Sequence, residues 1–259
     1  MRHDLSRIEQ ALRRAGETLD AFTAGAIESV LKEGGDPVTA ADLAVNEVLA
    51  GILPEQGDGW LSEETADDPS RLSCRRVWVV DPVDGTREFI AGIPEWCVSV
   101  GLVEDGMPVA GGIYAPTSDR LILGAVGEGV TLNGEPTRIS PVVDLRGALV
   151  LASRSETKRG EWERFHTAPI SVRNLGSVAY KLGLVAAGLA DATWTLVPKN
   201  EWDVAAGAAL VTAAGGIVFG IDGKPVRFNR PNPLLSGFVA TAPGIQGPVR
   251  RLLGISGAR

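Results

Sequence analysis

Two aspartates stand three residues apart at the end of an apolar run, in the segment VWVVDPVDGTREF at residues 77–89. Asp81 follows four apolar residues, and Asp84 precedes Gly85 and Thr86. Mg²⁺ takes hard oxygen ligands, commonly one or two carboxylates together with water and substrate phosphate. Two carboxylates on one turn could hold two such ions about 3.5 to 4 Å apart, the separation used in phosphoryl transfer. Asp-Pro and Asp-Gly also form ordinary turns, so the segment alone is also typical of a strand that ends in a turn.

Other acidic residues could complete such a metal site. Glu63 and Glu64 lie in the segment LSEET, just upstream of the apolar run. Taken alone, such a pair is typical of a solvated surface. Asp203 begins an alanine-rich segment, and Asp42 follows Thr39 by three residues, so both have an alternative interpretation as helix-capping residues.

The N-terminal part of the chain is predicted to be helical. Apolar residues recur at intervals of three and four from Leu5 to Val30, which predicts one long amphipathic helix that ends at GGDP, residues 34–37. A capping box predicts a second helix after Thr39. The residues that we expect to face the core from this helix are Leu43, Val45, Leu49 and Ile52. The run from Val77 to Val80 predicts a strand that is buried on both faces.

The rest of the chain divides into two patterns. Up to about residue 140, β-rich runs separated by turns such as EDG and Asn133-Gly134 predict an antiparallel sheet with hairpins. From about Leu149, strand and helix patterns alternate, which predicts a mostly parallel α/β sheet covered by helices. We therefore expect one α/β domain over residues 1–259, with subdomains at about 1–140 and 141–259.

Composition excludes several classes of function. The formal net charge is −7 and the isoelectric point is about 5.0, which argues against binding to a nucleic-acid polymer or to an anionic membrane. No apolar stretch is long enough to span a bilayer, and the N-terminus lacks a hydrophobic signal region. Cys74 and Cys97 fit neither a disulfide framework nor a zinc site. A cytoplasmic protein is the simplest expectation.

Three acidic segments, taken together, carry a resemblance to a known family. LSEET, WVVDPVDGTREF and EWDVAAGAALVTAAGG, in this order and at these separations, resemble the signature segments of the inositol monophosphatase superfamily of Mg²⁺-dependent, lithium-sensitive phosphatases. DPVTAADLAVNE and VGEGVTLNGEPTRIS are similar to further segments, and the resemblance extends to about Ala242. It implies a layered α-β-α-β-α sugar-phosphatase-like fold, two or three Mg²⁺ ions, a small phosphorylated metabolite as substrate and a possible homodimer.

The resemblance also implies roles for individual residues. Glu63, Asp81 and the Val83 carbonyl would bind one metal, and Asp81, Asp84 and Asp203 the second. Thr86, oriented by Asp42, would help to deprotonate a metal-bound water that attacks phosphorus directly, with Glu63 at the same catalytic centre. The residues expected to contact the substrate are Asp84, Gly85, Thr86, Arg154, Ser177, Lys181 and Asp203.

The residues after Thr86 bear on the substrate. Inositol monophosphatases typically have D-G-T-x-N-F, whereas DGTREF here resembles the 3′(2′),5′-bisphosphate nucleotidase branch, which hydrolyses 3′-phosphoadenosine 5′-phosphate to AMP and phosphate. Lys181 and Arg154 would bind the second phosphate of such a substrate. Leu196 stands where inositol enzymes often have a substrate-binding glutamate. The resemblance therefore favours a nucleotide substrate.

Alternative interpretations remain for the function and for these side chains. The chain could act on inositol monophosphate or fructose 1,6-bisphosphate, or be a non-catalytic metal or nucleotide sensor of the same fold. Lys181 could simply face solvent, and Arg154 could form a surface salt bridge. Tyr180 and Trp202 could stack on adenine or belong to the core.

Overall fold

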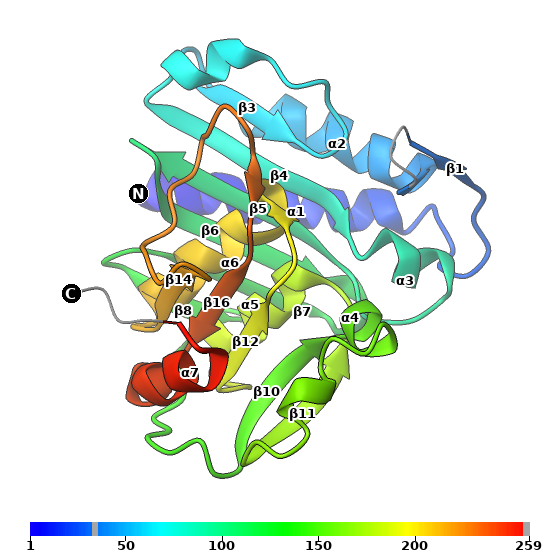
Figure 1. Ribbon diagram of the computed structural model, residues 1–259. Coiled ribbons are helices and arrows are strands. Elements are labelled where there is room, and N and C mark those ends of the chain that lie inside the picture. Colours follow the sequence, from blue (N-terminus) through cyan, green and yellow to red (C-terminus); the bar gives the residue numbers. More distant parts are fainter. Residues whose placement is uncertain (33–35, 256–259) are drawn as a thin grey trace.

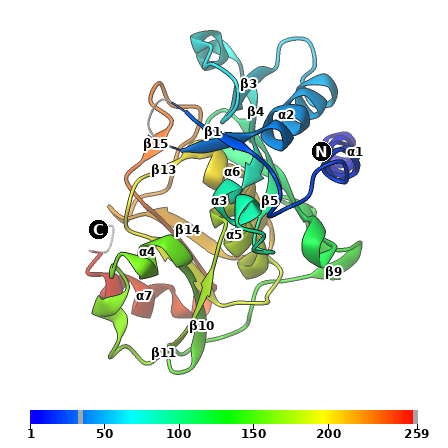
Figure 2. The ribbon, with the colours of Figure 1, turned by 90° about the vertical axis from the view of Figure 1, so that its right-hand side faces the viewer.

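The computed structural model of this protein describes residues 1–32 and 36–255. Its elements form alternating layers of helix and sheet (Figures 1 and 2). Helices α1 and α2 cover one face of a seven-stranded sheet, α5 and α6 lie between this sheet and a five-stranded sheet, and α4 and α7 lie beyond it. The helices are α1 (Arg2–Leu19), α2 (Ala40–Ile52), α3 (Thr86–Ile90), α4 (Arg154–Lys158), α5 (Val178–Ala186), α6 (Glu201–Ala213) and α7 (Gln246–Leu253). This is the layered α/β fold that the sequence predicts.

The seven-stranded sheet carries the candidate site at the end of its second strand. Its strands, in spatial order, are β3 (Gly59–Ser62), β4 (Arg76–Asp84), β5 (Cys97–Glu104), β6 (Met107–Ala115), β7 (Arg120–Ala125), β8 (Gly129–Leu132) and β9 (Glu135–Thr137). All neighbours are antiparallel except β3 and β4, which run parallel. Asp105 and Gly106 form the predicted β5–β6 turn, both with positive φ, as a two-residue hairpin requires.

The five-stranded sheet is mixed: four of its strands run in one direction, as a mostly parallel half requires, and β16 runs in the other. Its strands, in spatial order, are β11 (Ile170–Leu175), β10 (Ala148–Ser153), β12 (Ala192–Thr195), β16 (Phe238–Thr241) and β14 (Ile217–Gly220). β10 is parallel to β11 and β12, but β16 is antiparallel to both β12 and β14. The chain reaches β16 from β14 through a loop without a crossover helix, and such a connection permits antiparallel pairing. The small strands β13 (Lys199–Asn200) and β15 (Leu234–Leu235) pair separately.

The first helix is shorter than its apolar spacing predicts. It ends at Leu19, and the chain then forms β1 (Ser29–Leu31), which pairs antiparallel with β2 (Pro37–Thr39). Gly25 lies in the intervening segment at φ +83°, where its N–H donates to the Phe89 carbonyl. This contact draws the chain away from the helix axis. Part of the GGDP segment lies outside the described residues.

The second helix begins as predicted. Thr39 and Asp42 form its capping box, with the Thr39 N–H donating to the Asp42 carboxylate at 2.8 Å. Its buried apolar positions include Val45 and Leu49. Leu43, which we expected to face the core, is 49% exposed, because α1 and β4 cover only the opposite side of this helix.

Helix α6 is buried between the two sheets, and glycines in β5 and β6 allow its backbone to lie close to these strands. An added Cβ at Gly111 would lie 2.6 Å from the Ala206 carbonyl oxygen, and one at Gly101 would lie 2.8 Å from the Ala206 nitrogen. Only glycine at these positions of β5 and β6 lets the helix backbone pack this closely. This close packing fixes the first turn of α6, and with it Asp203, against the central strands. Within the described part of the chain, no helix is long and apolar enough to cross a membrane.

Candidate metal and phosphate site

The end of β4 presents Asp81 and Asp84 to one cavity. The strand is buried in the sheet, and its register with β5 is broken by a bulge between these two residues. Gly85 follows at φ +101°, a conformation that side chains other than glycine rarely adopt, and α3 begins at the next residue. The predicted sharp turn after the two aspartates is therefore present. It places Thr86 and the first amides of α3 at the cavity wall.

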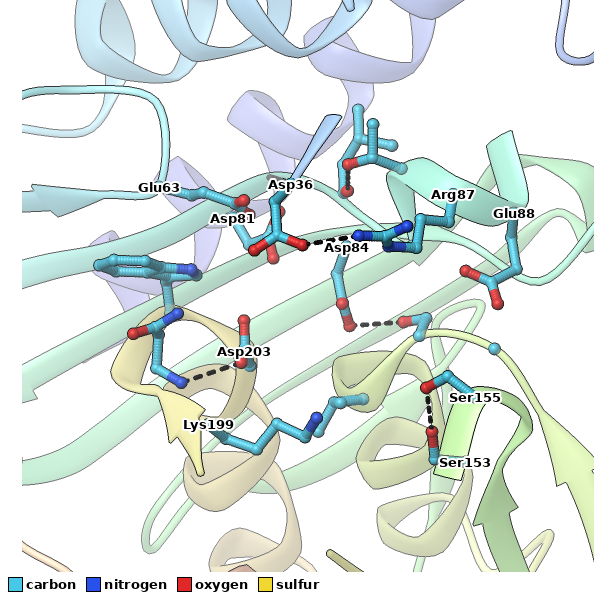
Figure 3. A pocket seen from close by; sticks show the side chains of 18 of the residues that line it. Asp36, Glu63, Asp81, Asp84, Arg87, Glu88, Ser153, Ser155, Lys199 and Asp203 are labelled. Atoms are coloured by element: carbon cyan, nitrogen blue, oxygen red, sulfur yellow. Dashed lines mark hydrogen bonds and ion pairs between the residues drawn. The ribbon is translucent and has the colours of Figure 1, made fainter. Parts of the chain in front are cut away.

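Three carboxylates from separate elements meet beside this turn. Glu63 follows β3, Asp81 is in β4, and Asp203 lies in the first turn of α6. One oxygen of each lies within 4.8 Å of the others (Figure 3). β3 and β4 are parallel, so their carboxyl ends lie at the same edge of the sheet. The capping box of α6 holds Asp203, which accepts a hydrogen bond from the Asn200 N–H at 2.9 Å.

The charges of this cluster favour a bound cation. Burial, and then the neighbouring charges of Glu63 and Asp84, raise the pKa of Asp81 well above its usual range. Burial followed by Asp84 and Glu63 does the same to the pKa of Asp203. Within the described residues, Oδ1 of Asp81 is buried without a hydrogen-bond partner. A divalent cation would satisfy this oxygen and offset the repulsion, so the residues present fit Mg²⁺.

Lys32 is a member of the site that the sequence did not indicate. It follows β1, and its Nζ lies 2.9 Å from Glu63 and 2.6 Å from Glu64. Both glutamates are thus ion-paired with Lys32. The sequence alone was also consistent with a pair of glutamates on a solvated surface. Lys32 was missed because the region was predicted to be the end of a long helix, and no local signal places it beside residues 63 and 64.

Thr86 and Asp42 are in contact, as the resemblance implies. The Thr86 hydroxyl lies 3.1 Å from Asp42 Oδ1 and 3.0 Å from the Val83 carbonyl, so it can donate to either. The other Asp42 oxygen accepts from the hydroxyl and backbone N–H of Thr39. The same capping box that starts α2 therefore orients a buried carboxylate toward the Thr86 hydroxyl. Val83 and Thr86 both line the cavity.

Asp84 lies beside the cluster but is held by the start of α5. Its Oδ2 accepts hydrogen bonds from the Ser177 hydroxyl, at 2.6 Å, and from the Ala179 N–H. Burial raises the pKa of Asp84, while these two bonds and Lys181 oppose the rise. Ser177, expected to bind substrate, lines the cavity and uses its hydroxyl to hold Asp84. Its φ of +55° is unusual for serine and marks a constrained backbone at the site.

Two lysines lie on the side of the cavity formed by α5 and β13. Lys181 is buried rather than facing solvent, and its Nζ donates to the carbonyls of Leu175 and Ser177. Burial lowers the pKa of its ammonium to about 8, although Asp84 opposes this change. Lys199, which the sequence analysis missed, also lines the cavity. Its place in the cavity depends on β13, a two-residue strand that no sequence pattern predicts.

Arg154 is not among the residues that line the cavity, and its contact with the substrate stays a prediction. Its guanidinium forms an ion pair with Glu95, and Glu95 also accepts from the Gly176 N–H at 2.8 Å. Arg154 thus supports the loop before α5. Tyr180 is buried and hydrogen-bonded to Ser118, so it belongs to the core, whereas Trp202 does line the cavity.

The cavity as a whole has a volume of about 280 Å³, enough for a small phosphorylated molecule. It is lined by residues from both halves of the chain. They include Asp36, Glu63, Asp81, Val83, Asp84, Gly85, Thr86, Glu88, Ser153, Ser155, Gly176, Ser177, Lys181, Lys199, Asn200, Trp202 and Asp203.

Carboxylates at the edge of a sheet can bind metal ions, and backbone amides at a helix start can bind phosphate. Together they are typical of the active site of a metal-dependent phosphatase. A model of the inositol monophosphatase family matches residues 2–248, and the chain belongs to that family. It is therefore a metal-dependent phosphomonoesterase, of a family that depends on Mg²⁺.

Relatives of the chain include proteins with two different named activities. An inositol-1-monophosphatase of Mesorhizobium japonicum is 35% identical, over 85% of this chain and 86% of its own. The 3′(2′),5′-bisphosphate nucleotidase CysQ of Salmonella typhimurium is also 35% identical, over 92% of this chain and 99% of its own. The solved structure of an inositol monophosphatase of Thermotoga maritima matches with a TM-score of 0.82 at 27% identity, over 98% of this chain and 96% of that one.

Proposed function

We propose that this phosphatase hydrolyses 3′-phosphoadenosine 5′-phosphate to AMP and phosphate. The observation that carries the proposal is a pair of lysines, Lys181 and Lys199, that line the same cavity as the three carboxylates. Figure 3 shows Lys199 extending below Asp203 toward the interior of the cavity. A substrate with one phosphate at the carboxylate cluster could place a second anionic group near these ammonium groups.

Two features of the chain further support a nucleotide bisphosphate. Leu196 packs against the core and supplies no carboxylate where inositol enzymes often have a glutamate. Trp202 lines the cavity and offers an aromatic surface for a base. The equal identities to an inositol-1-monophosphatase and to a bisphosphate nucleotidase make inositol monophosphate the second candidate substrate.

The metal would be held by Glu63, Asp81 and Asp203, with Asp84 and the Val83 carbonyl as further candidate ligands beside them. Mg²⁺ bound there supplies positive charge for the phosphoryl oxygens and lowers the pKa of coordinated water. We expect two or three ions at turnover.

The protein's own groups would position the phosphate and move the proton. The amides of Gly85 and Thr86 belong to the start of α3, where backbone N–H groups have no intrahelical partner and can donate to phosphate oxygens. The Thr86 hydroxyl can accept a proton from the attacking water and pass its own to Asp42 Oδ1, which lies 3.1 Å away. Because Asp42 is held by Thr39 from its other oxygen, the pair keeps its orientation during this transfer.

A substrate panel tests the proposal. Phosphate release should be measured with 3′-phosphoadenosine 5′-phosphate, inositol 1-phosphate and fructose 1,6-bisphosphate, each with Mg²⁺ and with excess EDTA. We expect Mg²⁺-dependent release that is fastest, as kcat/KM, from the nucleotide. An equal or higher value for inositol 1-phosphate would overturn the nucleotide preference, while leaving the phosphatase activity intact. A cytoplasmic location, a homodimer and a division into two subdomains near residue 140 stay predictions.

A further inference from the structure

Glu88 is a cavity carboxylate outside the metal cluster. It lies in α3, three residues after Gly85, and lines the cavity together with Ser153, Ser155 and Gly176. In Figure 3 its carboxylate points toward Ser155, on the opposite side of Asp84 from Glu63 and Asp81. Within the described residues, the one hydrogen bond that its carboxylate accepts comes from its own backbone N–H. It therefore has oxygen lone pairs to offer to a bound molecule.

The position of Glu88 is fixed by packing. Gly176 lies directly against the side chain: an added Cβ at residue 176 would be 2.5 Å from Glu88 Cγ and 2.6 Å from Cδ. The Gly176 N–H is in turn bonded to Glu95, which is paired with Arg154. Glycine at 176 thus leaves the room in which the glutamate lies, and the surrounding hydrogen bonds hold that backbone in place. An acceptor held in this way loses little side-chain entropy when a ligand binds.

The charge around Glu88 restricts what it can receive. Lys181 and Arg154 as well as Asp84 act on Glu88, but a phosphate in direct contact with its carboxylate would still be repelled by it. A hydroxyl group is suited, because it donates to a carboxylate and remains an acceptor for the nearby Ser155 hydroxyl. Glu88 is only two residues from Thr86, whose amide we place at the reacting phosphate. The hydroxyl would therefore be close to the ester in the substrate.

We propose that Glu88 is a specificity-determining residue that accepts a hydrogen bond from a substrate hydroxyl on a carbon next to the ester-bearing carbon. The inference rests on the proposed phosphatase site but not on the choice of nucleotide. In 3′-phosphoadenosine 5′-phosphate the hydroxyl would be the ribose 2′-OH, and polyol phosphates also carry such a group. Glu88 would thus select phosphate esters of vicinal diols over simple alkyl phosphates.

Two small substrates test this selection directly. Glycerol 2-phosphate has hydroxyls on both neighbouring carbons, and isopropyl phosphate has the same carbon skeleton without them. A hydrogen bond to a charged acceptor predicts that the wild-type kcat/KM is at least about tenfold higher for glycerol 2-phosphate. Glu88→Ala should reduce this ratio to about one, whereas Glu88→Gln, which keeps an acceptor of the same size, should retain part of it.

Gly176→Ala provides a second variant, because its added methyl group would displace Glu88 without changing the carboxylate itself. It should lower the same ratio. Glu47→Ala, at an exposed position of α2, is the matched control and should leave the ratio at the wild-type value. Thermal unfolding of each variant checks that the fold is retained.

The outcomes separate this inference from the proposed function. A wild-type ratio near one, or an equal loss on both substrates in Glu88→Ala, would overturn the role of Glu88. Failure of the wild-type protein to hydrolyse either ester would overturn it too, together with a general phosphatase activity at the site. A ratio that falls as expected, with no preference for 3′-phosphoadenosine 5′-phosphate in the substrate panel, would support Glu88 and contradict only the nucleotide.

Discussion

Replacing Asp81 by asparagine should make the metal-free protein more stable. Asp81 is 1% exposed, its Oδ1 has no partner within the described residues, and Glu63 and Asp203 lie close by. A buried polar atom without a partner costs about 1–3 kcal/mol. Asparagine has the same shape, carries no charge and can donate from Nδ2 to a neighbouring carboxylate. We therefore expect Asp81→Asn to raise the free energy of unfolding by about 1–3 kcal/mol in EDTA, a rise of about 2–10 °C in Tm.

In Mg²⁺ the order of stability should reverse, so that wild type is more stable than Asp81→Asn. Ligands that bind only the folded state stabilise it, by about 2.7 kcal/mol at a concentration of 100 times Kd. The wild-type protein should gain this stability, while Asp81→Asn should gain much less because a ligand is lost. Scanning calorimetry in EDTA and in Mg²⁺ measures both effects. Asp20→Asn, at the exposed end of α1, is the control and should change neither.

The pH dependence of the stability of the metal-free protein also tests whether the charge of Asp81 destabilises the fold. The folded pKa of Asp81 is raised by burial and by the neighbouring carboxylates, whereas the unfolded value is about 3.9. A carboxyl group with a raised folded pKa contributes stability below the unfolded pKa and loses it as pH rises through the folded value. The stability of wild type relative to Asp81→Asn should therefore fall as the pH rises above about 4 in metal-free buffer. The reasoning is refuted if the variant is the less stable protein in EDTA, with a Mg²⁺ response equal to that of wild type.

Three further substitutions test other parts of the site and fold. Asp84→Asn should leave Tm within a few degrees and lower kcat by at least about a hundredfold, because it changes a group beside the reacting phosphate; near-normal turnover would contradict this role. Lys199→Ala should lower kcat/KM for 3′-phosphoadenosine 5′-phosphate more than for glycerol 2-phosphate, with Lys224→Ala, an exposed lysine outside the cavity, as the control. Arg71 is 1% exposed and is hydrogen-bonded to Asp67 and Asn229. Arg71→Leu should therefore lower the free energy of unfolding by about 3 kcal/mol, as measured by urea unfolding. A loss below about 1 kcal/mol would show that these bonds contribute little to stability.

Much of the metal site is visible in the sequence because its geometry is local. Asp81 and Asp84 are placed by one strand and one glycine turn, and Asp42 belongs to the capping box that the sequence indicates. Asp203 is the third residue of the helix in a second capping box, whose N-cap is Asn200 rather than Asp203 itself. Both aspartates take part in helix capping, and their functional roles stay predictions. Each uses one oxygen to start a helix and is held, by that bond, facing the site.

The remaining residues of the site depend on contacts that no local pattern encodes. Lys32 reaches Glu63 from the residue after β1, in a region predicted to be helical because the apolar spacing of α1 continues past Leu19. Glu88 enters the cavity only because Gly176, far along the chain, leaves room for it. Contacts between residues far apart in the chain leave no periodic pattern in the sequence, so they could not be predicted from it.

The mixed second sheet has a similar origin. A helix between two strands predicts parallel pairing, and β10, β11 and β12 follow that rule. β16 follows a loop rich in proline and glycine, and the sequence does not state on which side of β12, or in which direction, it pairs.

We propose that Glu63, Asp81 and Asp203 hold the catalytic metal. Anomalous diffraction from crystals grown with Mn²⁺ in place of Mg²⁺ tests it most directly, because the scattering locates the ion without reference to activity. We predict an anomalous peak among these three carboxylates, and its loss in Asp81→Asn crystals. A peak elsewhere in the molecule, with none at this cluster, would contradict the account.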